Sequence, residues 1–147
     1  MGGRFSLQKV LDYRIHVQND EAEAMSRVQA EFNAMQSRRD ALVGTQAAAR
    51  TRFQANCAAG QTAGQIAATG TYLKDLGQQI ERSNAELAKQ GERVEAQRKR
   101  LLAAAQDKEI IEKLRARAEA EFMSAERKSE ERYIQEFLIN RAAHAKP

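Results

Sequence analysis

Residues 73–101 read LKDLGQQIERSNAELAKQGERVEAQRKRL, and this stretch decides the fold. Apolar side chains recur in it at a strict seven-residue spacing, at Leu73, Ile80, Leu87, Val94 and Leu101. A second series, offset by three residues, includes Leu76, Ser83, Gln90, Gln97, Ala104, Ile111 and Ala118. Such a repeat places its members along one seam of an α-helix, which is typical of a coiled coil. The pattern predicts a helix over about 70–143, with Thr71 as its N-cap.

A weaker form of the same repeat runs through the first half of the chain. Its two series are Leu7, Arg14, Glu21, Val28, Met35 and Leu42, and Leu11, Gln18, Met25, Phe32 and Arg39. They predict a helix over about 5–56, with Ser6 as its N-cap. Between the helices, residues 53–73 contain no charged side chain, and three glycines lie within this segment, at positions 60, 64 and 70. A glycine inside a helix costs roughly 1 kcal/mol relative to alanine, so we expect the connection at about 57–69.

Two amphipathic helices joined by a short connection form an antiparallel hairpin most simply. We therefore expect an all-α fold, an antiparallel two-helix coiled-coil hairpin with a longer second helix, as a single domain over residues 1–147. The composition agrees, because Ala, Glu, Lys, Leu and Arg make up 76 of the 147 residues and the one proline is Pro147. The second helix is expected to extend past the first at about 122–143.

The composition also argues against several classes of function. Two histidines and one cysteine, Cys57, are too few for a metal cluster or a Cys-His nucleophile pair, and no phosphate-binding loop occurs. We expect no cofactor and no enzymatic activity, since a two-helix hairpin lacks the concave pocket of an active site. The net charge of +4 comes from interleaved signs, which argues against nucleic-acid binding. With no signal peptide or membrane span expected, the chain is predicted to be cytosolic or to reach a membrane only through partners.

One group of apolar residues near the C-terminus lies on a single face of the second helix. Tyr133, Ile134, Phe137 and Leu138 have the spacing i, i+1, i+4 and i+5. If they lie beyond the first helix, they are an exposed binding surface. If the turn is asymmetric, or if the first helix starts earlier, they are ordinary seam residues. The spacing leaves both interpretations open.

The sequence resembles the flagellar export protein FliJ family over essentially its whole length. The opening run RFSLQKVLDYR, residues 4–14, is similar to the family's N-terminal motif. Further agreement in order and spacing lies at Tyr72-Leu73, Leu76, Leu101, Ala104-Ala105, Lys108, the run 111–114, the charged stretch 126–136 and Arg141. One departure is that Gln135-Glu136-Phe137 stands where the family often has an Asp-Glu pair.

The resemblance implies a non-enzymatic component of bacterial flagellum protein export, and hence of motility and chemotaxis. Family members are similar to the stalk of rotary ATPases and occupy the central pore of a hexameric flagellar export ATPase. They promote assembly of that ring and its ATPase activity, couple it to the membrane export gate protein, and handle export chaperones. The implied location is cytoplasmic, peripheral at the inner face of the cell membrane at the flagellar base.

Two contact surfaces follow as hypotheses. The surface expected to bind the ATPase ring comprises Leu7, Val10, Leu11, Arg14, Arg127, Arg132, Tyr133, Phe137 and Arg141. The surface expected to bind the export gate comprises Tyr72, Leu76, Gln79, Ile80 and Ser83. In the second set, Leu76 and Ile80 also fit an ordinary seam, whereas Tyr72 and Gln79 lie outside it.

Three other interpretations remain open at the level of sequence. The equivalent stalk of a virulence-type III secretion injectisome would share this pattern. A generic coiled-coil scaffold would be a parallel homodimer whose helix continues through residues 57–69. A nucleic-acid binder would use the +4 charge and show a steep salt dependence.

Overall fold

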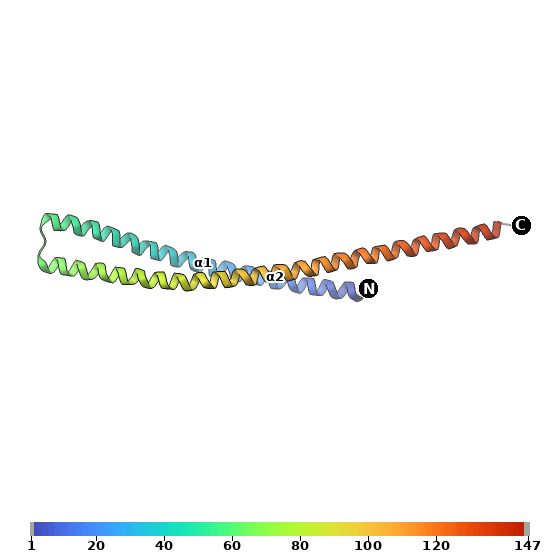
Figure 1. Ribbon diagram of the computed structural model, residues 1–147, viewed down its shortest axis with the longest axis horizontal. Helices are drawn as coiled ribbons and strands as arrows, with labels where there is room; N and C mark the ends of the chain where they lie inside the picture. The colour runs from blue at the N-terminus through green and yellow to red at the C-terminus, as the bar shows by residue number, and fades with distance from the viewer. Residues whose placement is uncertain (1, 146–147) are drawn as a thin grey trace. The chain divides into compact units, whose positions relative to one another are not determined.

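The computed structural model describes the backbone of residues 2–145 and the side chains of residues 6–145. The chain forms two helices, α1 (Gly2–Ala59) and α2 (Ala63–Ala145), and no strand occurs in residues 2–145 (Figure 1). The helices run in opposite directions and the second is the longer. The predicted all-α antiparallel hairpin with a longer second helix is therefore confirmed.

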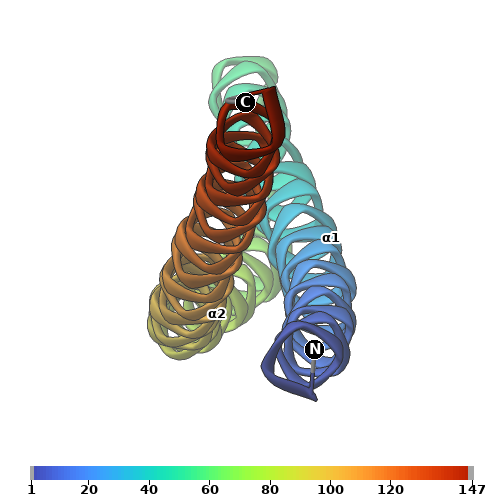
Figure 2. The ribbon, with the colours of Figure 1, turned by 90° about the vertical axis from the view of Figure 1, so that its right-hand side faces the viewer.

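The chain divides into two units, and the helices contact each other within both. We call residues 20–101 the turn unit, and residues 1–19 with 102–147 the terminal unit. In the turn unit, Gln97 lies against Glu21 and Gln90 against Val28. In the terminal unit, Arg14 lies against Asp107. Each unit thus contains a stretch of both helices side by side (Figure 1 and Figure 2). The assignment of residues 1–147 to a single domain stays a prediction.

The buried residues coincide with the seven-residue repeat. In the turn unit, the buried side chains of α2 are Leu76, Leu87, Gln90, Val94 and Gln97. In the terminal unit, the buried side chains are Leu11 and Ala104. All seven are repeat positions expected from the sequence. None of the described side chains is less than 2% exposed, as expected for an interior only one seam wide.

The connection between the helices is shorter than predicted. It comprises residues 60–62, because α1 continues to Ala59 and α2 begins at Ala63. The predicted connection over 57–69 is therefore wrong. Only Gly60 needs the left-handed region, with φ of 93°, and its N–H donates to the Cys57 carbonyl at 3.2 Å. Gly64 and Gly70 lie inside α2. The turn also contradicts the alternative of a generic coiled-coil scaffold, in which a single helix continues through residues 57–69.

Thr62 starts the second helix, and it does so by a reciprocal cap. The Gln65 N–H donates to Thr62 Oγ1 at 3.2 Å, and the Thr62 N–H donates to Gln65 Oε1 at 3.1 Å. This capping box satisfies two helix-end donors at once. The N-cap predicted at Thr71 is wrong, since Thr71 lies within α2 and donates to the Ala67 carbonyl. Ser6 likewise lies within α1.

Candidate binding surface

Two buried glutamines fix the register of the helices in the turn unit. Gln90 is 3% exposed, and its amide donates to the Val28 carbonyl at 3.1 Å and to a Glu31 carboxylate oxygen at 3.2 Å. Gln97 donates to the carbonyl and the carboxylate of Glu21. Polar groups in a seam find their hydrogen-bond partners in only one alignment of the helices, so the two glutamines select one register.

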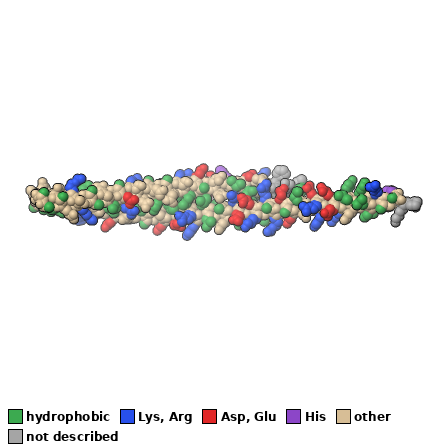
Figure 3. All heavy atoms as spheres, turned by 90° about the horizontal axis from the view of Figure 1, so that it is seen from above, with side chains coloured by type: hydrophobic (Ala, Val, Ile, Leu, Met, Phe, Trp, Pro, Cys, Tyr) green, Lys and Arg blue, Asp and Glu red, His purple; other side chains and the backbone are tan. Residues whose placement is uncertain are grey.

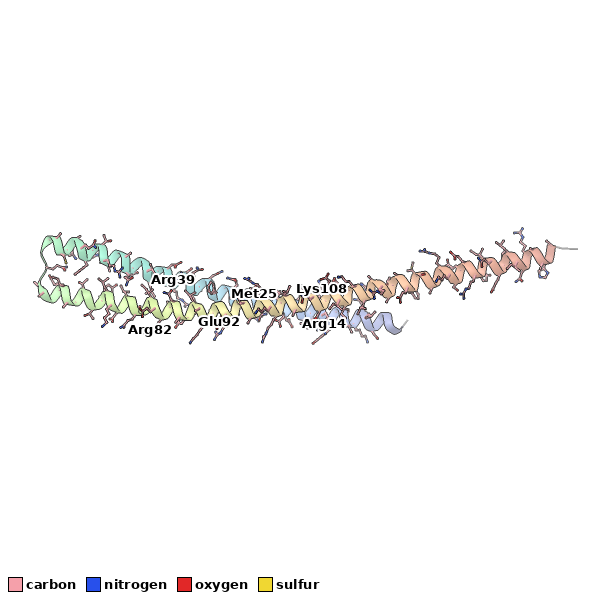
Figure 4. All side chains as sticks on the ribbon, in the orientation of Figure 1. Arg14, Met25, Arg39, Arg82, Glu92 and Lys108 are labelled. Atoms are coloured by element: carbon pink, nitrogen blue, oxygen red, sulfur yellow. The ribbon has the colours of Figure 1, made fainter. Side chains whose placement is uncertain are left out.

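Arg14 occupies a seam position of the terminal unit instead of an open surface. Its guanidinium lies 3.5 Å from the Asp107 carboxylate and 5.6 Å from the centroid of the Tyr13 ring. Its Nε is buried and has no hydrogen-bond partner among the described residues. Figure 4 labels Arg14 on α1 and Lys108 on α2. Because Arg14 and the 5% exposed Leu11 take part in helix pairing, they are not open contact residues in this structure.

Beyond the paired region, α2 continues as an exposed segment, which we define as residues 123–145. Every residue in this range is exposed. Its large apolar side chains are 52 to 71% exposed and comprise Met123, Tyr133, Ile134, Phe137, Leu138 and Ile139. Figure 3 shows hydrophobic side chains gathered near the C-terminal end of the helix. The expected extension of the second helix therefore carries a large amount of unburied apolar surface.

Four of these residues form the apolar stripe, which we define as Tyr133, Ile134, Phe137 and Leu138. The seam repeat, continued past Phe122, falls on Ala125, Ser129, Arg132, Glu136 and Ile139. Each residue turns the helix by about 100°, so Ile134 lies about 200° around the helix from Arg132. The centre of the stripe therefore points away from the direction of the seam, and Tyr133 is its member nearest to the seam. The interpretation of the stripe as ordinary seam is contradicted by this offset and by its exposure.

The structure separates the residues predicted to bind the ATPase ring into two groups. Those on the exposed segment are Arg127, Arg132, Tyr133, Phe137 and Arg141. Those on α1 are Leu7, Val10, Leu11 and Arg14, of which Val10 alone is classed as exposed, at 39%. Arg132 and Phe137 lie on different sides of the helix, because the two are five residues apart. Four basic and four acidic residues leave the exposed segment without net charge, so its apolar stripe is its more distinctive feature.

The residues predicted to bind the export gate are also divided. Leu76 is 5% exposed, and Ile80 and Ser83 are partly buried in the seam of the turn unit. Tyr72, 49% exposed, and Gln79 face outward. The sequence interpretation did not identify a shallow hollow beside Tyr72, lined by Ala49, Arg52, Phe53, Asn56, Thr69 and Tyr72. Its signal was the repeat of α1, which continues past Leu42 through Gln46, Ala49 and Phe53.

Residues with metal-binding chemistry do not converge in the part of the chain that the structure describes, where no group of three or more His, Cys, Asp or Glu could hold an ion. Cys57 is exposed near the turn, with its Sγ 3.9 Å from Gln61 Oε1. Neither α1 nor α2, over the residues searched, combines the length and the hydropathy that a membrane span requires.

The fold and the exposed stripe define a helical-hairpin protein of the coiled-coil class. The model of the family described as "Flagellar FliJ protein" matches residues 3–146, and the chain belongs to this family. Membership makes the protein a component of the flagellar export apparatus. No curated protein and no solved structure matches the chain.

Proposed function

We propose that this protein is the central stalk of the flagellar export ATPase complex. In this role the exposed segment enters a hexameric ATPase ring, promotes its assembly and stimulates ATP hydrolysis that the ring itself performs. The turn unit contacts the membrane export gate protein, and the hairpin also handles export chaperones. The protein acts by binding and not by catalysis, at the inner face of the cell membrane at the flagellar base.

The observation that supports this function best is the exposed segment with its outward apolar stripe. Contiguous exposed apolar surface on a helix is typical of a protein-binding site. Tyr133 and Phe137 are aromatic residues that commonly dominate binding energy when a partner buries them. The surrounding charges, alternating in sign, are worth roughly 0–1 kcal/mol per exposed ion pair. Weak polar contacts around an apolar centre suit a stalk that moves within its ring.

For the export gate, the exposed side chains of Tyr72 and Gln79 support a contact on the turn unit. Leu76, Ile80 and Ser83 contribute to this surface only by holding α2 against α1. The hollow lined by Phe53 and Tyr72 adds apolar surface from both helices. The gate contact is therefore expected to depend on Tyr72 more than on the three seam residues.

Truncation of the apolar stripe tests the stalk assignment. We expect Tyr133→Ala combined with Phe137→Ala to raise the concentration needed for half-maximal stimulation of the purified export ATPase by at least about tenfold, since buried aromatics at interfaces are worth about 2 kcal/mol or more. The control is Leu102→Ala, which truncates a side chain 57% exposed in the paired part of α2. Unchanged stimulation by the double variant, with unchanged helix content, would refute the assignment.

The stalk of a virulence-type III secretion injectisome is the alternative within the same fold. The family match to the flagellar protein favours the flagellar system. A pulldown with the purified chain separates the two, because retention of the flagellar ATPase or of an injectisome ATPase identifies the ring to which this stalk belongs.

A further inference from the structure

We propose that the exposed segments of two copies of this protein pair with each other, antiparallel, through the apolar stripe. This self-association goes beyond the proposed stalk function and uses the same surface. It would bury Tyr133, Ile134, Phe137 and Leu138, which are 55 to 71% exposed in the single chain. The second copy is chosen as the occupant because the charges at the two ends of the stripe are complementary to each other.

The apolar stripe has an acidic residue at its N-terminal end and a basic residue at its C-terminal end. Glu130 lies four residues before Ile134, and Arg141 lies four residues after Phe137. Glu130, Ile134, Phe137 and Arg141 are thus spaced by four, three and four residues, the spacing of a coiled-coil seam. Both charged side chains are exposed. A two-layer apolar centre with opposite charges at its ends is self-complementary under a two-fold axis.

One antiparallel register satisfies every position of this short seam. When Ile134 of one copy faces Phe137 of the second copy, the two-fold axis places Phe137 of the first against Ile134 of the second. The same register places Glu130 opposite Arg141 at both ends, with Tyr133 and Leu138 flanking the apolar layers on the two sides of the seam. The pairing therefore buries four aromatic side chains, two from each copy, and makes two intermolecular ion pairs.

The other alignments are disfavoured by charge. A parallel pair would place Glu130 against Glu130 and Arg141 against Arg141, and like charges directly opposite each other are destabilising. An antiparallel pair shifted by seven residues would place a charged side chain of each stripe opposite an apolar one, so the ion pairs would be lost. Opposite charges at the two ends of one stripe thus select both orientation and register.

Self-association of this kind is expected to be weak and reversible. Two apolar layers make an interface at the small end of those that proteins use, so the dimer should dissociate on dilution. The balance of four acidic and four basic residues removes net charge repulsion between the two exposed segments. Because the dimer covers Tyr133 and Phe137, self-association and ring binding exclude each other. The dimer would thus hold unused protein in a form that cannot engage the ring.

Sedimentation of the full chain over about a hundredfold range of concentration measures the dimerisation constant directly. We expect Glu130→Arg and Arg141→Glu each to weaken the dimer at least about tenfold, because each variant places like charges opposite each other. The double variant Glu130→Arg with Arg141→Glu should recover the wild-type constant, since it exchanges the two charges. The matched control is Glu136→Arg, which makes the same charge change on another side of the helix.

Each outcome bears on one part of the proposal. A chain that stays monomeric throughout the range would overturn it, and so would a Glu136→Arg variant that weakens the dimer as much as Glu130→Arg. Failure of the charge exchange to restore the dimer would refute the antiparallel register. Helix content, measured by circular dichroism, shows whether each variant folds. Stimulation of the ATPase is measured separately, so the stalk assignment can fail while the dimer stands, and the reverse.

Discussion

Gln90 offers the most direct test of how the hairpin keeps its register. Replacement by alanine removes an amide that is 3% exposed and makes two hydrogen bonds across the seam, to the Val28 carbonyl and the Glu31 carboxylate. A neutral bond contributes about 1 kcal/mol and a bond to a charged group about 1.5 kcal/mol or more. Alanine favours the helix by a few tenths of a kcal/mol more than glutamine. We therefore expect Gln90→Ala to lower the free energy of unfolding by about 2 kcal/mol.

Urea unfolding followed by circular dichroism measures this loss, and Gln78→Ala is its control. Gln78 is exposed, so the same substitution there should change the free energy of unfolding by less than about 0.5 kcal/mol. Gln90→Leu separates register from stability, because an apolar residue at this position should restore the free energy of unfolding while permitting other alignments. Equal stability of Gln90→Ala and the wild type would refute the inferred role of the two hydrogen bonds.

Three further substitutions test the turn and the seam by thermal unfolding. Gly60→Ala should lower the free energy of unfolding by about 1–2 kcal/mol, because its φ of 93° is strained for any residue with a Cβ; an unchanged melting temperature would contradict this. Gly91→Ala should raise the free energy of unfolding by up to about 1 kcal/mol, since its Cβ would lie at an ordinary contact distance, 3.7 Å, from the Phe32 ring. Destabilisation by this variant would show that the seam is packed more tightly there. Arg14→Leu should raise the free energy of unfolding by about 1 kcal/mol, because the exposed ion pair with Asp107 contributes little and the buried Nε lacks a hydrogen-bond partner. A lower free energy of unfolding would show that the ion pair contributes more than this.

The sequence predicted the seam well because the seven-residue repeat consists of the positions that two paired helices bury. Leu76, Leu87 and Val94 are buried where the repeat places them. The turn was predicted less well because glycine content alone does not decide where a helix begins. Of the three glycines near the turn, only Gly60 adopts a positive φ, and the capping box of Thr62 with Gln65 starts the helix earlier. Gly64 and Gly70 thus lie inside α2 despite their intrinsic cost to a helix.

The prediction of contact residues was limited by a conflict already visible in the sequence. Leu11 was assigned both to the seam and to a contact surface, and a side chain 5% exposed is already occupied by helix pairing. Tyr72 and Gln79 do not have this conflict, because they lie outside the repeat and are exposed. The exposure of the apolar stripe could not be predicted from the sequence, because it depends on how the two helices align.

The sequence of α2 itself encodes the end of the coiled coil. After Phe122 the next four seam positions are Ala125, Ser129, Arg132 and Glu136, which offer little apolar surface to a partner helix, and the first large apolar seam residue is Ile139. Three large apolar side chains of this segment, Ile134, Phe137 and Leu138, lie instead on the side of the helix that faces away from the seam. A longer α1 would therefore meet small and charged residues and would gain little by pairing further. The sequence of α2 thus forms a surface in the exposed segment that is distinct from the seam of the hairpin.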